Sequence, residues 1–277
     1  MPSNPFLQVR REELPLALAM FTQFFLIITC FWILKPIKKG MFIQFYDQAG
    51  FAFMGLEFTA SQAELLAKML NMIVAFVAVV VFSWLSLHLR RQRLSYVFSG
   101  FFIFSYLIFG AWLLEPSGAG VWSFYLFGDL FSTLMVATFF AFLNDSVTPD
   151  LAKRVYGLVG LGGVCGGVFG ASFVSARVAL FPFQAWLWIC TGLTLLVIQA
   201  AWYAGRRVQV PLNQVDEAPA RPAGHPATEG AKLVFSSRYL LSIVAIVGLY
   251  EIISTILDFQ FTTTVSHFLD GPAIGQH

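Results

Sequence analysis

Six charged residues stand inside or directly beside long apolar segments, where a charge is costly unless it faces a partner or a water-filled cavity. Three are lysines in the sequence LKPIKKG, and one is an aspartate in the middle of FYLFGDLFSTLMV. A glutamate and a second aspartate belong to the segment YEIISTILDFQFTTT. These residues form the candidate binding set: Lys35, Lys38, Lys39, Asp129, Glu251 and Asp258.

Each group also has a purely structural interpretation. The three lysines could extend to lipid headgroups, although cations at an outward-facing helix end run against the positive-inside rule and favour an anionic partner. Asp129 is followed one turn later by Ser132 and Thr133, which fits a cavity wall. The last segment carries a polar stripe on one helix face, typical of a wet pathway, or of acids paired with further helices. The stripe comprises Glu251, Ser254, Thr255, Asp258 and Thr262.

Catalytic and metal-binding patterns are missing from the sequence. It contains no H-E-x-x-H, no G-x-S-x-G and no C-x-x-C, and none of its four histidines has a partner at ligand spacing. We therefore expect a protein that is not an enzyme and that needs no metal and no cofactor.

The composition determines which elements hold these charges. The chain has 277 residues, of which 58% are hydrophobic, 17% aromatic and only 12% charged. A soluble domain carries about 25% charged residues, so this chain would leave large apolar patches in water. A net charge of +2 gives no reason to expect a nucleic-acid partner. The composition therefore predicts an all-α integral membrane protein with the lipid bilayer as its surroundings.

Seven apolar runs are long enough to cross a hydrocarbon core, which takes about 20 residues. Pro36 is expected to kink or end the first of them. The fifth, YGLVGLGGVCGGVFGAS, has glycines at four-residue spacing, which predicts a smooth face for close helix packing rather than a phosphate-binding loop. The runs are 14–34, 66–88, 95–114, 120–143, 155–180, 183–204 and 239–262.

Basic residues gather in alternate connections, which places the N-terminus in the cytoplasm by the positive-inside rule. Residues 206–237 are rich in Pro, Ala, Gly and charge, and predict a flexible cytoplasmic linker. We therefore expect an N-terminal six-helix transmembrane half over 1–205 and the first helix of an incomplete second half over 238–277. Six helices, a linker and a seventh helix suit the first part of a major-facilitator-like bundle.

Three segments in the first half resemble motifs of the non-mitochondrial ATP/ADP translocases, the nucleotide exchangers of plastids and intracellular bacteria. LKPIKK at 34–39 is similar to L-R-D-T-K-D, with Lys38 at the family's lysine and Lys35 at its arginine. GDLF at 128–131 is similar to G-E-L-W and puts Asp129 at the acidic position. AKRVYGLVGLG at 152–162 closely resembles A-K-R-F-Y-x-L-F-G-x-G.

The last apolar segment resembles the family's Y-x-x-x-x-N-L-V-E-x-x-W-K. Tyr250 and Asp258 match the pattern, whereas Thr255, Phe261 and Thr262 stand where the family has Asn, Trp and Lys. The resemblance implies alternating-access exchange of ATP and ADP, or transport of a related phosphorylated anion, in a bacterial inner membrane. Lysines would bind the phosphates, and Asp129 and Asp258 would pair with those lysines when the site is empty.

Two other hypotheses fit the residues. In the first, Asp129, Glu251 and Asp258 are proton sites in a major-facilitator symporter of another solute. In the second, the chain is a transporter-derived membrane scaffold or sensor that binds a soluble partner through its linker. Transport that collapses with an uncoupler yet needs no counter-substrate would favour the symporter over nucleotide exchange. Association with a soluble partner in the absence of any ligand would favour the scaffold.

Overall fold

The computed structural model describes residues 10–53, 55–208 and 232–268. Seven helices in this part of the chain are long and apolar enough to cross a membrane, so the protein is an all-α, multi-pass membrane helix bundle, as predicted. A two-stranded hairpin, β1 (Phe51–Phe53) and β2 (Leu56–Phe58), joins the first two helices. The helices are α1 (Leu14–Ala49), α2 (Ala60–His88), α3 (Arg91–Trp112), α4 (Gly118–Ser146), α5 (Pro149–Arg177), α6 (Phe183–Arg207) and α8 (Arg238–Phe268).

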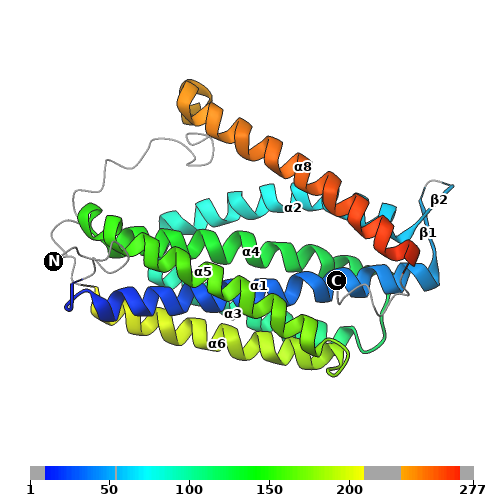
Figure 1. The fold of residues 1–277 in the computed structure, drawn as a ribbon, viewed down its shortest axis with the longest axis horizontal. Coiled ribbons are helices and arrows are strands. Elements are labelled where there is room, and N and C mark those ends of the chain that lie inside the picture. The colour runs from blue at the N-terminus through cyan, green and yellow to red at the C-terminus, as the bar shows by residue number, and fades with distance from the viewer. Residues whose placement is uncertain (1–9, 54, 209–231, 269–277) are drawn as a thin grey trace.

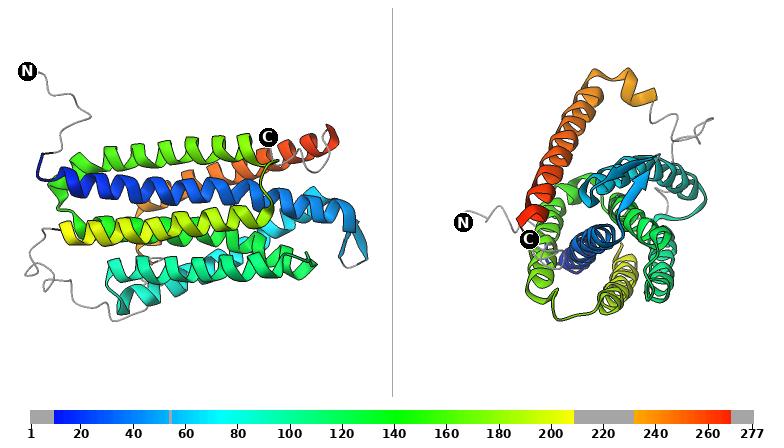
Figure 2. Two further views of the ribbon diagram at one scale, coloured as in Figure 1. Left: turned by 90° about the horizontal axis from the view of Figure 1, so that it is seen from below. Right: turned by 90° about the vertical axis from the view of Figure 1, so that its right-hand side faces the viewer.

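Helix α1 lies at the centre of the bundle, where it packs against α2, α4, α5 and α6. The end-on view in Figure 2 shows the other helices arranged around it. Helix α8 is different, because it approaches the bundle near its C-terminal end and diverges from it toward its N-terminal end (Figure 1). Its apolar residues are mostly exposed, as expected for a helix surrounded by lipid rather than by protein.

Pro36 does not end the first helix, so that part of the prediction was wrong. α1 continues through Pro36 for more than three further turns and has 36 residues, about 54 Å at 1.5 Å per residue. The residues beyond the proline include Phe42 and Ile43, which are fully buried against neighbouring helices. Tertiary packing therefore holds the helix together across the missing N–H group. The extension matters because it keeps Lys38 and Lys39 on the same rigid element.

Three glycines of α5, Gly162, Gly166 and Gly170, lie directly against α1, as the four-residue spacing predicted. A Cβ atom on Gly162 or Gly170 would approach the carbonyl oxygen of Phe21 or Thr29 to 2.7 or 2.8 Å, and one on Gly166 would approach that of Phe25 to 2.5 Å. The Thr29 hydroxyl also donates a hydrogen bond of 3.2 Å to the Gly166 carbonyl. Glycine is needed at these positions because the two backbones are nearly in contact.

The linker predicted over 206–237 lies mainly outside the described residues, since 209–231 are not described, and so does the end of the chain from 269. Helix α6 ends at Arg207, and α8 begins at Arg238. The limits of the linker, its flexibility and the division into two halves stay predictions.

One end of the bundle is rich in basic side chains and carries ion pairs between helices. There the guanidinium of Arg154, near the start of α5, donates to both carboxylate oxygens of Glu13, at 2.5 and 3.3 Å. Burial raises the pKa of the Glu13 carboxyl, but the hydrogen bonds and charge of Arg154 outweigh this, so its pKa lies below the usual 4.5. The ionised Glu13 therefore helps to hold the start of α1 against α5.

This pair predicts a component of acid sensitivity. A carboxyl whose pKa is lower in the folded state stabilises that state above its unfolded pKa of 4.5, and this stabilisation is lost as the pH falls through the lower folded value. On acidification from about pH 6 to about pH 3, Glu13→Gln should lose less stability than the wild type, and the two should converge at the acid end. Thermal unfolding in detergent measures this. Glu12→Gln, at an exposed neighbour, is the control and should behave like the wild type.

Candidate functional site

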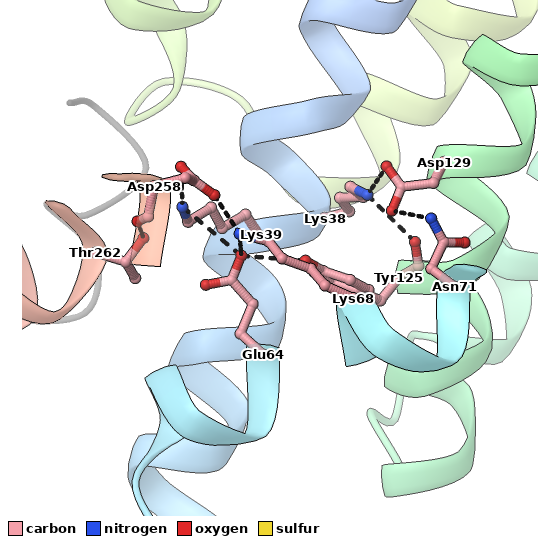
Figure 3. A network of polar contacts seen from close by, with 9 residues as sticks. All are labelled: Lys38, Lys39, Glu64, Lys68, Asn71, Tyr125, Asp129, Asp258 and Thr262. Carbon is pink, nitrogen blue, oxygen red and sulfur yellow. Dashed lines mark hydrogen bonds and ion pairs between the residues drawn. The ribbon is translucent and has the colours of Figure 1, made fainter. Parts of the chain in front are cut away.

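Six charged side chains meet in the half of the bundle beyond Pro36, where α1, α2, α4 and α8 come together (Figure 3). Three are lysines and three are carboxylates, so the group is electrically neutral when all six are ionised. We call this group the charge network. Its members are Lys38, Lys39, Glu64, Lys68, Asp129 and Asp258.

The first part of the charge network is an ion pair within the bundle, between Lys38 of α1 and Asp129 of α4. Lys38 is only 4% exposed. Its Nζ atom also lies 3.5 Å from the carbonyl oxygen of Tyr125 and 4.3 Å from the centre of that ring. The amide of Asn71 donates a hydrogen bond of 3.0 Å to the second oxygen of Asp129. Lys38 is thus held on several sides by polar groups of the bundle itself.

Gly128 makes room for this lysine. A Cβ atom at position 128 would lie 2.6 Å from Cδ of Lys38. The glycine before Asp129 therefore lets the buried lysine stem pass beside α4 and reach the carboxylate.

The second part of the charge network connects α1 and α2 with α8. Asp258 accepts one lysine at each carboxylate oxygen: Lys39 at 2.9 Å on Oδ1, and Lys68 on Oδ2. Glu64 lies on the other side of the lysines, with its Oε1 atom 3.4 Å from Lys68 Nζ and 3.7 Å from Lys39 Nζ. The Tyr125 hydroxyl donates to the same Oε1 atom at 3.1 Å, so this tyrosine touches both parts of the network.

Local helix geometry explains how these side chains come together. Consecutive residues of an α-helix point about 100° apart, so Lys38 faces α4 while Lys39 faces α2 and α8. On α2, Glu64, Lys68 and Asn71 recur at spacings of four and three residues and share one face. A capping box at the start of α2 fixes the helix one turn before Glu64, with Thr59 accepting from the backbone of Gln62 and the Gln62 side chain accepting from that of Thr59.

Four of the predicted site residues belong to the charge network: Lys38, Lys39, Asp129 and Asp258. The other two do not. Lys35 is exposed, and its Nζ lies 5.2 Å from the centre of the Trp32 ring. Glu251 is exposed on α8, and it has no ion pair among the described residues. The hydroxyls of Ser132 and Thr133 bond to the backbone of their own helix, at the carbonyl of Asp129.

Four residues of the site were not predicted from the sequence: Glu64, Lys68, Asn71 and Tyr125. A signal for Glu64 was present in the T-x-x-Q capping box at 59–62, which would have started the second helix six residues earlier than 66. With that start, Glu64 and Lys68 become a polar face inside a membrane-spanning helix, and such a face indicates a partner or a cavity.

A cavity of about 670 Å³ opens beside the charge network, between α1, α5 and α8. Lys35, Lys39 and Asp258 supply charged groups to its wall, and Trp32 and Phe261 supply aromatic rings. This volume falls within the range of about 300–1,000 Å³ typical of small-molecule sites. Cations together with aromatic surfaces are suited to an anion that also carries a planar or apolar part.

The fold and the site define a class: a multi-pass helical membrane protein with a neutral charge network beside an open cavity. Part of the chain is similar to the chloroplast protein "ADP,ATP carrier protein 1" of Arabidopsis thaliana. The two sequences are 28% identical over 148 residues. The match covers 48% of this chain and 23% of that carrier, so the chain spans well under half of its length. No protein-family model matches the chain, and no solved structure matches it.

Proposed function

We propose that the protein is a membrane transporter that moves a phosphorylated anion, of the ATP and ADP type, by alternating access. The observation that carries this proposal is the charge network, in which lysines beside an open cavity are neutralised by carboxylates from different helices. The name of the chloroplast carrier supports the nucleotide as substrate class.

The network suits transport because buried charges must be compensated in every state that a transporter visits. Removing one partner of a buried ion pair costs about 3–5 kcal/mol, so a site that simply lost its anion would be unstable. In the empty site, Asp258 and Glu64 together neutralise Lys39 and Lys68. When an anionic substrate enters from the cavity, its phosphate oxygens take the place of the carboxylate, and the lysines stay paired throughout.

The cavity wall supports an anion with an aromatic part. Lys35 and Lys39 lie on the same side of α1, about one turn apart, with Trp32 beside Lys35. Phosphate groups would lie against the two ammonium groups, and a purine ring would lie against Trp32 or Phe261. Lys35 thus keeps its predicted role in binding as part of this proposal, although it has no ion pair in the described part of the chain.

The proposal includes an arrangement in the membrane. Helices α1–α6 form the N-terminal half over 1–205, α8 begins a second half over 238–277, and 206–237 is the connecting linker. The basic end of the bundle, which holds Arg154 and both ends of the linker, faces the cytoplasm of a bacterial cell, in keeping with the positive-inside rule.

The proton-coupled symporter and the scaffold are not favoured by any specific contact. Glu251, one of the three suggested proton sites, is exposed and has no ion pair with the charge network among the described residues. The scaffold hypothesis depends on the linker, most of which lies outside the described residues.

Exchange in proteoliposomes tests the proposed function. The full-length protein, reconstituted with internal ADP, should take up labelled ATP. Lys39→Gln should lower the rate about tenfold or more, because a hydrogen bond to a charged group contributes about 1.5–3 kcal/mol. Lys153→Gln removes a lysine whose side chain is 79% exposed at the far end of the bundle, and it should leave the rate unchanged.

Two outcomes contradict the proposal. Absence of exchange for every nucleotide tested excludes this substrate class. An unchanged rate in Lys39→Gln would show that transport does not use this site.

A further inference from the structure

The two parts of the charge network differ in how firmly they are fixed, and this difference assigns them different roles. We propose that Lys39 and Lys68 form the phosphoryl subsite of the proposed transporter, that the Asp258 carboxylate is its internal occupant, and that Lys38 and Asp129 are a structural pair. The inference rests on the proposed function for its substrate class, and it names Lys68 and Glu64 as residues of the site.

The position of Asp258 is that of a bound anion. Each of its carboxylate oxygens meets a different ammonium group, Lys39 on Oδ1 and Lys68 on Oδ2. A phosphoryl group carries terminal oxygens that can bridge the same two ammonium groups, through charge-assisted hydrogen bonds of the same kind. The two lysines come from α1 and α2, which pack directly against each other, so the pair exists without α8.

Asp258 can leave, whereas Asp129 cannot easily do so. Asp129, whose side chain is 26% exposed, comes from α4, which packs along α1, and its partner Lys38 is almost completely buried. Asp258 comes from α8, which reaches the bundle only near its C-terminal end, and its side chain is 35% exposed (Figures 1 and 3). Asp258 and Lys39 line the cavity, so an anion in the cavity has access to the Lys39–Asp258 ion pair.

Glu64 sets the charge that the subsite presents. It is only 2% exposed and is fixed by the Tyr125 hydroxyl as well as by both lysines. When Asp258 withdraws, two lysines and one glutamate remain, which leaves one positive charge uncompensated. Lys35, on the wall of the same cavity, supplies a second. The subsite is therefore matched to a phosphoryl group of one or two negative charges, and a neutral ligand would leave it uncompensated.

Binding of inorganic phosphate to the purified full-length protein in detergent tests the subsite without requiring transport. Asp258→Asn removes the internal occupant and should tighten phosphate binding about tenfold, the gain expected if the carboxylate occupies the lysines about nine-tenths of the time. Adding Lys68→Gln to this variant should abolish the gain. Glu251→Gln removes an acid from the same helix that has no ion pair in the described part of the chain, and it should bind phosphate like the wild type.

Two further variants separate the effect of the carboxylate from an effect on folding. Asp258→Glu keeps the occupant and should bind phosphate as weakly as the wild type. If Asp258→Asn cannot be purified as a monodisperse protein, Lys68→Gln in the otherwise unchanged chain decides, because it should lose the weak phosphate binding that Lys153→Gln keeps.

Isothermal titration calorimetry provides the readout. Equal phosphate affinity in the wild type and Asp258→Asn, or no phosphate binding in either, overturns the inference. If phosphate affinity changes in the variants as expected but the protein does not exchange nucleotides, only the proposed function is contradicted. If the protein exchanges nucleotides but Asp258→Asn does not change its phosphate affinity, only the subsite is contradicted.

Discussion

Replacing Asp129 by asparagine should destabilise the bundle more than any other single change to the charge network, by about 3 kcal/mol. The substitution leaves the Lys38 ammonium buried between α1 and α4 without its ion-pair partner, because the other groups in direct contact with its Nζ atom are the neutral Tyr125 carbonyl and ring. Thermal or denaturant unfolding in detergent measures the effect.

A double variant separates loss of the charge pair from loss of packing. Lys38→Met with Asp129→Leu removes both charges together, and it should recover most of the stability that Asp129→Asn loses, since apolar replacement of a buried ion pair is often neutral. If the double variant is as unstable as the single one, the cost lies in side-chain shape rather than in unpaired charge. Glu251→Gln, which removes an exposed acid, should leave stability unchanged.

The second large effect is expected at the contact between α1 and α5. Gly166→Ala places a methyl group 2.5 Å from the carbonyl oxygen of Phe25, a backbone atom that cannot turn aside. The two helices must separate, and overpacking of this kind costs about 1–3 kcal/mol, occasionally more. The hydrogen bond from Thr29 to the Gly166 carbonyl would be strained by the same movement.

The same helix offers a matched control. At Gly160 an added Cβ meets no atom within 4 Å, so Gly160→Ala should be neutral or slightly stabilising, because alanine favours a helix over glycine. Relative to the wild type, the unfolding temperature should therefore fall in Gly166→Ala and stay equal or rise slightly in Gly160→Ala. Equal destabilisation by both would mean that α5 does not approach α1 as closely as the structure indicates.

The helical membrane fold could be predicted from the sequence because apolar runs of about 20 residues have few alternatives in a bilayer. Helix ends were harder. Hydropathy stopped the first helix at 34 because a proline and three lysines follow, yet α1 runs to Ala49, since packing on both sides outweighs the local cost of Pro36. The hairpin β1–β2 was not predicted, because its three-residue strands are too short to show a pattern.

The candidate site was predictable in part for a related reason. Lys38, Lys39, Asp129 and Asp258 stood out because each is a charge within or at the end of an apolar segment. Glu64 lay just before the predicted second span and was missed.

Only Asp258 of the last helix belongs to the charge network, and a role of Glu251 in the site stays a prediction. Their spacing fixes a shared helix face, whereas the divergence of α8 decides which part of that face meets other helices. Sequence periodicity gives directions around one helix and does not give the distance to the next one.

The adjacency of Lys38 and Lys39 restricts how the molecule can move. Because the two side chains leave α1 about 100° apart and are bound to different helices, a rotation of α1 about its own axis would pull both ion pairs out of register. The close backbone contact with α5 opposes the same rotation. Any change that opens the Lys39–Asp258 pair should therefore be a movement of the C-terminal part of α8 away from α1, with α1 as the stationary axis. Spin labels on α1 and on α8 near Asp258 would record that movement as an increase in distance.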